Sequence, residues 1–98
     1  MKKRYELLYI VEVIEQEAYE AVVAKINNVI TDNGGDIIKL DQWGKKKLAY
    51  EMRGKNDGLY VLVDFTIEPD VVRKELDHTL KATYEVLRHC IWMKGQLK

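Results

Sequence analysis

Four segments of the chain are rich in β-forming residues and show the alternation of apolar and polar positions that is typical of strands. Residues 5–13 and 59–67 are apolar at most positions, which is typical of strands in the middle of a sheet. Residues 36–52 form a longer and more polar segment, with a bend or bulge expected near Trp43 and Gly44. Residues 86–93 are the fourth predicted strand, and RGKNDG at residues 53–58 is predicted to be the loop of a hairpin.

Two other segments follow helical spacing. Residues 16–33 carry an apolar stripe that ends at Asn33-Gly34-Gly35, a left-handed stop, with Glu15, Glu17 and Glu20 in an exposed first turn. Pro69 opens a second helix at a position that needs no N–H group. Val72, Leu76 and Leu80 mark the side of this helix that we expect to be buried.

The resulting order, β-α-β-β-α-β, predicts an α+β fold of the ferredoxin-like, split βαβ type. We expect one domain over residues 1–98, built from a four-stranded antiparallel sheet with two helices on one face. Right-handed crossovers place the first and third strands in the middle of that sheet and the second and fourth at its edges. The more apolar composition of the first and third segments agrees with this order.

The sheet face without helices is expected to be partly apolar. Alternation assigns Leu59, Val61, Val63, Phe65 and Ile67 to the core, so that the open face carries Leu8, Ile10, Tyr60 and Leu62. An exposed apolar patch of this kind indicates a partner surface. The alternative is a face assignment that is wrong by one residue, which would exchange the two faces.

Composition narrows the class of protein. The chain is 47% hydrophobic with one proline, its apolar runs are too short to span a bilayer, and no signal segment opens it. A single cysteine, Cys90, suits a reducing compartment. We therefore expect a cytoplasmic globular protein without a membrane partner.

The charges cancel in sum, with 16 basic and 16 acidic residues, but they are segregated along the chain. Residues 2–4, 44–55 and 88–98 hold eleven Lys and Arg and one acid, whereas the rest holds five and fifteen. A partner would respond to this distribution rather than to the sum.

Catalytic chemistry is not indicated. His78, His89 and Cys90 do not form a metal set, because His89 and Cys90 point to opposite faces of a strand. Cys90 is expected to be a small core residue, and His78 a solvated or partly buried side chain. No glycine-rich phosphate loop precedes a helix. We expect no enzyme activity, cofactor, metal or small-molecule substrate.

Three motifs in order along the chain carry a family resemblance. They are RYE at residues 4–6, WGKKKLAYEM at residues 43–52 followed by GLY at residues 58–60, and RHCIWMK at residues 88–94. The second is similar to a family core of Gly, three Lys or Arg, LAY and a later G-x-Y. Together they resemble the family of the sixth protein of the bacterial small ribosomal subunit. Many members end in an acidic or extended tail, whereas this chain stops at Gln96-Leu97-Lys98, so no role of such a tail is inferred.

The resemblance implies a structural constituent of the small ribosomal subunit. It implies binding to small-subunit ribosomal RNA, with the eighteenth protein of that subunit as a heterodimer partner. A different interpretation of the open face is a ferredoxin-like regulatory module that dimerises through this face and binds a small metabolite. That alternative does not explain the segregated charges.

The topology brings the two chain ends together as a candidate RNA site. Lys2, Lys3 and Arg4 should lie near Lys94 and Lys98 in a basic cluster suited to phosphate contacts. Tyr5 is a candidate for stacking on a base, whereas Trp92 is expected in the core. Arg88 and His89 complete the predicted RNA-binding set.

The lysine run is assigned mainly to the protein partner. Alternation places Lys46, Leu48, Tyr50 and Met52 on one side of the strand, a mixture that resembles an interface. With Leu8, Ile10, Tyr60 and Leu62 they form the predicted partner surface. Protection of an edge strand by Lys45, Lys46 and Lys47 is an equally weighted explanation, and contact of these lysines with RNA is left open.

Overall fold

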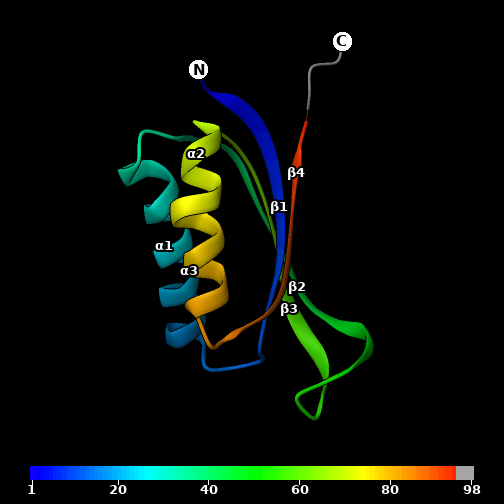
Figure 1. Ribbon diagram of the computed structural model, residues 1–98. Coiled ribbons are helices and arrows are strands. Elements are labelled where there is room, and N and C mark those ends of the chain that lie inside the picture. The colour runs from blue at the N-terminus through cyan, green and yellow to red at the C-terminus, as the bar shows by residue number, and fades with distance from the viewer. Residues whose placement is uncertain (95–98) are drawn as a thin grey trace.

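A four-stranded antiparallel sheet carries two helices on one face in the computed structural model, which describes residues 1–94 (Figure 1). Lys98 and the end of the chain therefore lie outside the described residues. The elements follow the predicted order. They are β1 (Lys3–Val11), α1 (Gln16–Asp32), β2 (Asp36–Met52), β3 (Lys55–Ile67), a second helix composed of α2 (Pro69–Val71), η1 (Val72–Leu76) and α3 (Asp77–Ala82), and β4 (Val86–Met93).

The strand order is β2-β3-β1-β4, which confirms the predicted central and edge positions. In the middle of the sheet, Leu7 of β1 lies opposite Val63 of β3 and Ile91 of β4. This register puts the odd-numbered residues of β1 and β3 on the helix side. The predicted face assignment is thus correct and is not displaced by one residue.

The core lies between the sheet and the helices. Leu7, Tyr9, Val63 and Phe65 from the central strands are fully buried, as is Ile26 of α1. Leu76 and Leu80 come from the second helix and are buried too, as the apolar stripe predicted. The second helix contains a π-helical turn, η1, between its two α-helical parts.

The β2–β3 hairpin differs most from the prediction. Its turn lies at Arg53 and Gly54, which both have positive φ, and β3 begins at Lys55 rather than after Gly58. Pairing thus extends through residues that the Asp-Gly signal assigned to a loop. Register shifts beside Ile38 and Trp43 are bulges, in agreement with the bend expected near Trp43.

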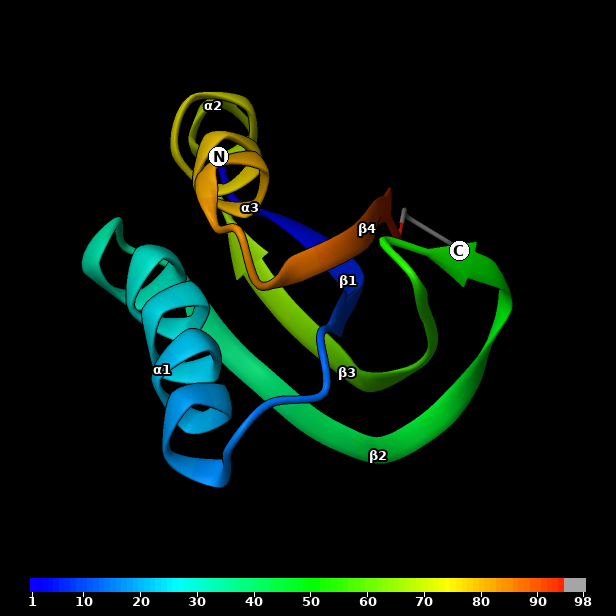
Figure 2. The same ribbon diagram turned by 90° about the horizontal axis from the view of Figure 1, so that it is seen from below.

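The long hairpin curves to the side of the sheet that has no helices. In Figure 1 it projects away from the helical layer, and in Figure 2 β2 follows a wide arc around the open side. Bulges increase local twist and bend a strand, which accounts for the arc. The hairpin is therefore placed to cover part of the open face.

Candidate nucleic-acid interface

The two ends of the described chain lie side by side. The backbone N–H of Lys94 donates to the carbonyl oxygen of Arg4 at 2.8 Å, which continues the β1–β4 ladder beyond Met93. Antiparallel pairing of β1 with β4 explains this proximity, because the first strand begins where the last one ends. The predicted juxtaposition of Arg4 and Lys94 is thus present.

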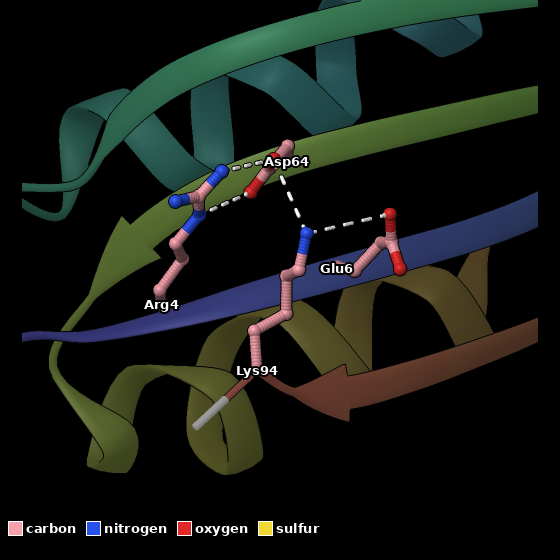
Figure 3. A network of polar contacts seen from close by, with 4 residues as sticks. All are labelled: Arg4, Glu6, Asp64 and Lys94. Carbon is pink, nitrogen blue, oxygen red and sulfur yellow. Dashed lines mark hydrogen bonds and ion pairs between the residues drawn. The ribbon is translucent and has the colours of Figure 1, made fainter. Parts of the chain in front are cut away.

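The charge of this region differs from the predicted basic cluster. Arg4 donates to Asp64 through two nitrogens, with Nε–Oδ1 at 3.0 Å and Nη2–Oδ2 at 2.7 Å. Lys94 Nζ lies 3.7 Å from Asp64 Oδ2 and 4.0 Å from Glu6 Oε2 (Figure 3). We call these four residues the terminal ion cluster. It consists of two cations and two carboxylates.

Other cations near the N-terminus are paired as well. Lys2 Nζ lies 3.2 Å from Asp36 Oδ2, and the terminal ammonium lies 2.7 Å from Glu68 Oε1. Among the described residues, Lys3 has no such ion pair. The predicted basic cluster thus also contains acids, because the neighbouring strands supply carboxylates that are distant in sequence.

Hydrogen bonds from Arg4 favour the ionised form of Asp64. The guanidinium of Arg4, hydrogen-bonded to this carboxylate, lowers the pKa of Asp64 despite the opposing effect of burial, and Lys94 adds to the lowering. The Asp64 side chain is 12% exposed. A phosphate that approached Arg4 would have to compete with this carboxylate.

The aromatic predictions at this end of the sheet are reversed. Tyr5 lies on the helix side, is 7% exposed and stacks on Phe65 with ring centroids 5.8 Å apart, so it is not available to stack on a base. Trp92, expected in the core, is 45% exposed because it pairs with Glu6 on the open face. Cys90 is exposed on the same face and is not the small core residue that was expected.

Arg88 and His89 point to opposite faces of β4. The Nε2 atom of His89 lies 3.1 Å from Asp77 Oδ1 on the helix side. Lys81 and then His89 hydrogen-bond to Asp77 and lower its pKa. Arg88 instead donates to the hydroxyl of Tyr50 on the hairpin. The two side chains therefore do not lie on one surface.

Two predicted partner-surface residues are buried within the chain. Ile10 and Leu48 are 8% and 9% exposed, since the curved hairpin lays Leu48 over the open face. Both lie close to Gly58, where an added Cβ would be 2.3 Å from Ile10 Cγ2 and 3.2 Å from Leu48 Cδ2. The two side chains form a small second core, which a partner cannot contact in this arrangement.

The remaining predicted partner residues are accessible to different degrees. Leu8, Leu62 and Tyr60 are half-buried on the open face, and Tyr60 stacks on Trp43 with ring centroids 6.3 Å apart. Lys46 and Tyr50 are exposed on the inner side of the hairpin, and Met52 is half-buried near its turn. A shallow depression beside Leu62 is lined by Glu6, Lys39, Asp41, Asp64 and Lys94.

Four cations of the hairpin lack carboxylate partners among the described residues. Within residues 1–94, Lys45, Lys46, Lys47 and Arg53 form no ion pair with a carboxylate; we call them the hairpin cations. By contrast, Lys55 on the same hairpin forms an ion pair, with its Nζ atom 3.9 Å from Glu12 Oε1. Within residues 1–94, other cations without such a pair are spread along the rest of the chain, at Lys3, Lys25, Lys39, Lys74 and Arg88. The hairpin therefore holds the largest group of cations that are free to meet a polyanion.

Exposed aromatic rings accompany the hairpin cations. Arg53 donates to the carbonyl oxygen of Tyr84, and its Cζ atom lies 4.4 Å from the centre of the Tyr84 ring. Tyr84 and Tyr50 are 69% and 57% exposed, and Trp43 is 43% exposed. Sequence reasoning missed Arg53, Tyr84 and Trp43 as site residues. The sequence showed only that the turn is basic. It could not show that Arg53 contacts Tyr84, because the two residues are distant in the chain and meet only in the folded structure.

The geometry and composition of residues 1–94 bear on two further kinds of site, a membrane span and a metal site. No helix there is long and apolar enough to cross a membrane. No group of three or more His, Cys, Asp and Glu is placed to hold a metal ion.

Known proteins match this chain over nearly its full length. The family model described as Ribosomal protein S6 matches residues 4–92. The chain is 43% identical over 90 residues to small ribosomal subunit protein bS6 of Moorella thermoacetica, with 91% of each protein covered. It is 37% identical over 95 residues to the protein of the same name from Desulforamulus reducens, covering 96% of this chain and 99% of the relative.

The fold is found in a solved relative. The crystal structure of 30S ribosomal protein S6 from Thermotoga maritima superposes with a TM-score of 0.89 at 25% sequence identity. The match covers 96% of this chain and 89% of the other. It confirms the ferredoxin-like fold class, and the family matches favour the ribosomal interpretation over a metabolite-binding regulatory module.

Proposed function

This chain belongs to the ribosomal protein S6 family, and we propose that it binds small-subunit ribosomal RNA cooperatively with the eighteenth protein of the subunit. As a member of this family it is a constituent of the small ribosomal subunit and not an enzyme. The proposal concerns which molecules it binds there and with which surfaces.

The observation that carries the RNA proposal is the difference between the two basic regions. Among the described residues, Lys2, Arg4 and Lys94 are paired with carboxylates, whereas the hairpin cations are not. A phosphate gains most from cations that do not have to leave another anion, because its binding then releases only counterions. We therefore assign the principal RNA contact to the hairpin cations.

The aromatic residues near the hairpin cations suit RNA. Unpaired bases stack on exposed aromatic rings and on arginine planes, and Tyr84 with Arg53 offers both in one place. Lys2, Lys3, Arg4 and Lys94 are retained as a second candidate contact. Lys3 is the member of that set without an ion pair among the described residues.

The open face is the proposed site of the protein partner. Leu8, Tyr60 and Leu62 lie there without a helix above them, beside a depression that is lined by both acids and bases. An apolar centre with a charged rim is the usual composition of a protein interface. The partner would cover Leu8 and Leu62 and leave the outer side of the hairpin to RNA.

Two triple variants with equal loss of charge test the RNA contact. Lys45→Ala/Lys46→Ala/Lys47→Ala should reduce affinity for small-subunit ribosomal RNA, measured with the eighteenth protein present at several salt concentrations. The slope of log affinity against log salt should fall by about 2 to 3, one unit for each lost phosphate contact. Lys2→Ala/Lys3→Ala/Lys94→Ala should change that slope by less than about 1.

The opposite ranking of the two variants would move the principal RNA contact to the chain ends. If neither variant changed the affinity or its salt dependence, the RNA-binding proposal would fail. Circular dichroism of both variants shows whether the fold is intact, which is expected because all the replaced lysines are exposed.

A further inference from the structure

The two edges of the sheet are protected to different degrees. The β2 edge contains lysines and two bulges, which are the devices that prevent strands from pairing between molecules. Along β4 the register with β1 is regular from Arg88 to Met93, and residues 89–93 contain no lysine and no proline. Trp92 and Met93 on this edge are 45% and 57% exposed. The β4 edge is therefore available for pairing.

We propose that two copies of this chain associate through their β4 edges in an antiparallel pair, with Cys90 opposite Cys90 of the second copy. This register makes the contact self-complementary. Arg88 then lies opposite Trp92 of the second copy on the open face, and Leu87 lies opposite Met93 of the second copy. Each contact occurs twice because the pair has two-fold symmetry.

Arg88 is suited to such a contact. It lies on the same sheet face as Trp92, since their partners on β1 are Ile10 and Glu6. One side of its guanidinium is directed at Tyr50, with Cζ 5.7 Å from the ring centre. The other side can receive the indole of the second copy in a cation–π contact. No acidic side chain within residues 87–93 opposes this arrangement.

The helix side of the same edge offers a matching depression. It lies between the second helix and β4, and it is lined mainly by apolar atoms of Tyr5, Val72 and Ile91, with Arg73, Asp77 and His89 among the other residues. In the proposed register, Ile91 of the second copy lies opposite His89 and enters this depression. Both sides of the new strand pair thus gain contacts.

The interface would be small because one strand from each copy forms most of it. We expect weak association, with a dissociation constant of about 0.1–1 mM. The proposal does not depend on RNA binding, and it is tested on the isolated protein without RNA or other proteins.

Disulfide trapping tests the register. Diamide oxidises two thiols to one disulfide and takes up the two hydrogen atoms that they lose. The N–H of Lys94 points to β1, so Cys90, four residues earlier in the same strand, would form a non-hydrogen-bonded pair with its copy. Such pairs have the closer Cβ atoms, about 4.5 Å apart, at the upper end of the range for a disulfide. Cys90 should form a covalent dimer at least about tenfold faster than Cys90→Ser/Tyr84→Cys, which carries its thiol at an exposed position outside β4. Equal rates would overturn the register.

Charge exchange tests the contact itself by sedimentation velocity over a range of protein concentrations. Trp92→Lys places like charges opposite each other and should weaken association about tenfold or more. Arg88→Glu/Trp92→Lys restores opposite charges and should recover it. Ile38→Lys, the matched control on the β2 edge, should leave association unchanged. A monomer at all concentrations, or association abolished only by Ile38→Lys, would overturn the proposal.

Discussion

Asp64 determines the charge balance of the open face. It receives Arg4 through two nitrogens and lies within ion-pair distance of Lys94, so it links β3 to β1 and to the end of β4. Its side chain is much less exposed than that of Arg4. Bidentate geometry and partial burial make this pair stronger than an ordinary surface ion pair.

Stability at low pH should depend on Asp64. The hydrogen bond from Arg4 lowers the pKa of this carboxyl below its usual 3.8. As the pH falls, Asp64 is therefore protonated in the unfolded chain before it is protonated in the folded protein. The stabilisation is present above about pH 4 and is lost as the pH falls through the lowered pKa of the folded state. Asp64→Asn should reduce the free energy of unfolding at pH 7 and flatten its decline in acid, as measured by urea denaturation.

The matched control for this measurement is Asp36→Asn. Asp36 pairs with Lys2, but its side chain is 74% exposed, and the contribution of such a pair is small. The variant should follow the parent protein at every pH. Parallel curves for Asp64→Asn and the parent would contradict the role assigned to Asp64.

Gly58 is a second residue with a demanding environment, because its surroundings leave no room for a side chain. Because an added Cβ would lie 2.3 Å from Ile10 Cγ2, Gly58→Ala should force the buried Ile10 to move. We expect a loss of about 1–3 kcal/mol in the free energy of unfolding, as for other overpacked sites. Asn56→Ala, exposed on the same strand, should be nearly neutral in the same denaturation experiment.

At the scale of elements, the β2–β3 hairpin is held against the rest of the fold at three points. Leu48 packs near Ile10 and Gly58, Arg88 donates to Tyr50, and Arg53 donates to the carbonyl of Tyr84. The last two contacts join the hairpin to β4 and to the turn that precedes it. They fix the orientation in which the hairpin cations are presented.

Leu48→Ala tests whether the small second core holds the hairpin in place. Removal of most of a buried leucine side chain should lower the free energy of unfolding by about 2 kcal/mol. It should also increase hydrogen exchange of backbone amides in residues 45–52 more than in β1. Leu40→Ala on the same strand is the control, because Leu40 is 38% exposed. Equal effects of the two variants would argue against the second core.

At the scale of the whole molecule, zero net charge coexists with separated surfaces. The terminal ion cluster neutralises one end, the hairpin cations leave the other end positive, and the open face between them is partly apolar. An arrangement of this kind can hold RNA and a protein at the same time.

Cooperative assembly is the corresponding prediction. The affinity of this chain for small-subunit ribosomal RNA should rise about tenfold or more when the eighteenth protein is present, in the range of ordinary coupling between sites. Titration calorimetry with and without that protein measures the change. Leu62→Glu should remove the gain without weakening the binding of RNA to the isolated chain. An unchanged affinity in the presence of the partner would exclude cooperativity.

Much of this architecture follows from local patterns. Alternation in residues 59–67, the helix stop at Asn33-Gly34-Gly35 and Pro69 at the start of a helix predicted the element order, the strand order and the faces. These patterns succeed because burial on one face imposes a fixed period on each element. The turn at Arg53 and Gly54 was missed, since Asp57-Gly58 gives a stronger local turn signal than the residues that actually turn.

The sequence by itself determined the family, the fold class and the total charge, because motifs, periodicity and composition are properties of the chain alone. Tertiary structure decided which charges remain free and which apolar residues remain exposed. Asp64 meets Arg4 from 60 positions away, and the curved hairpin buries Ile10 and Leu48. Ion pairing and burial depend on distances in space, and these distances cannot be read from the spacing of residues along the sequence.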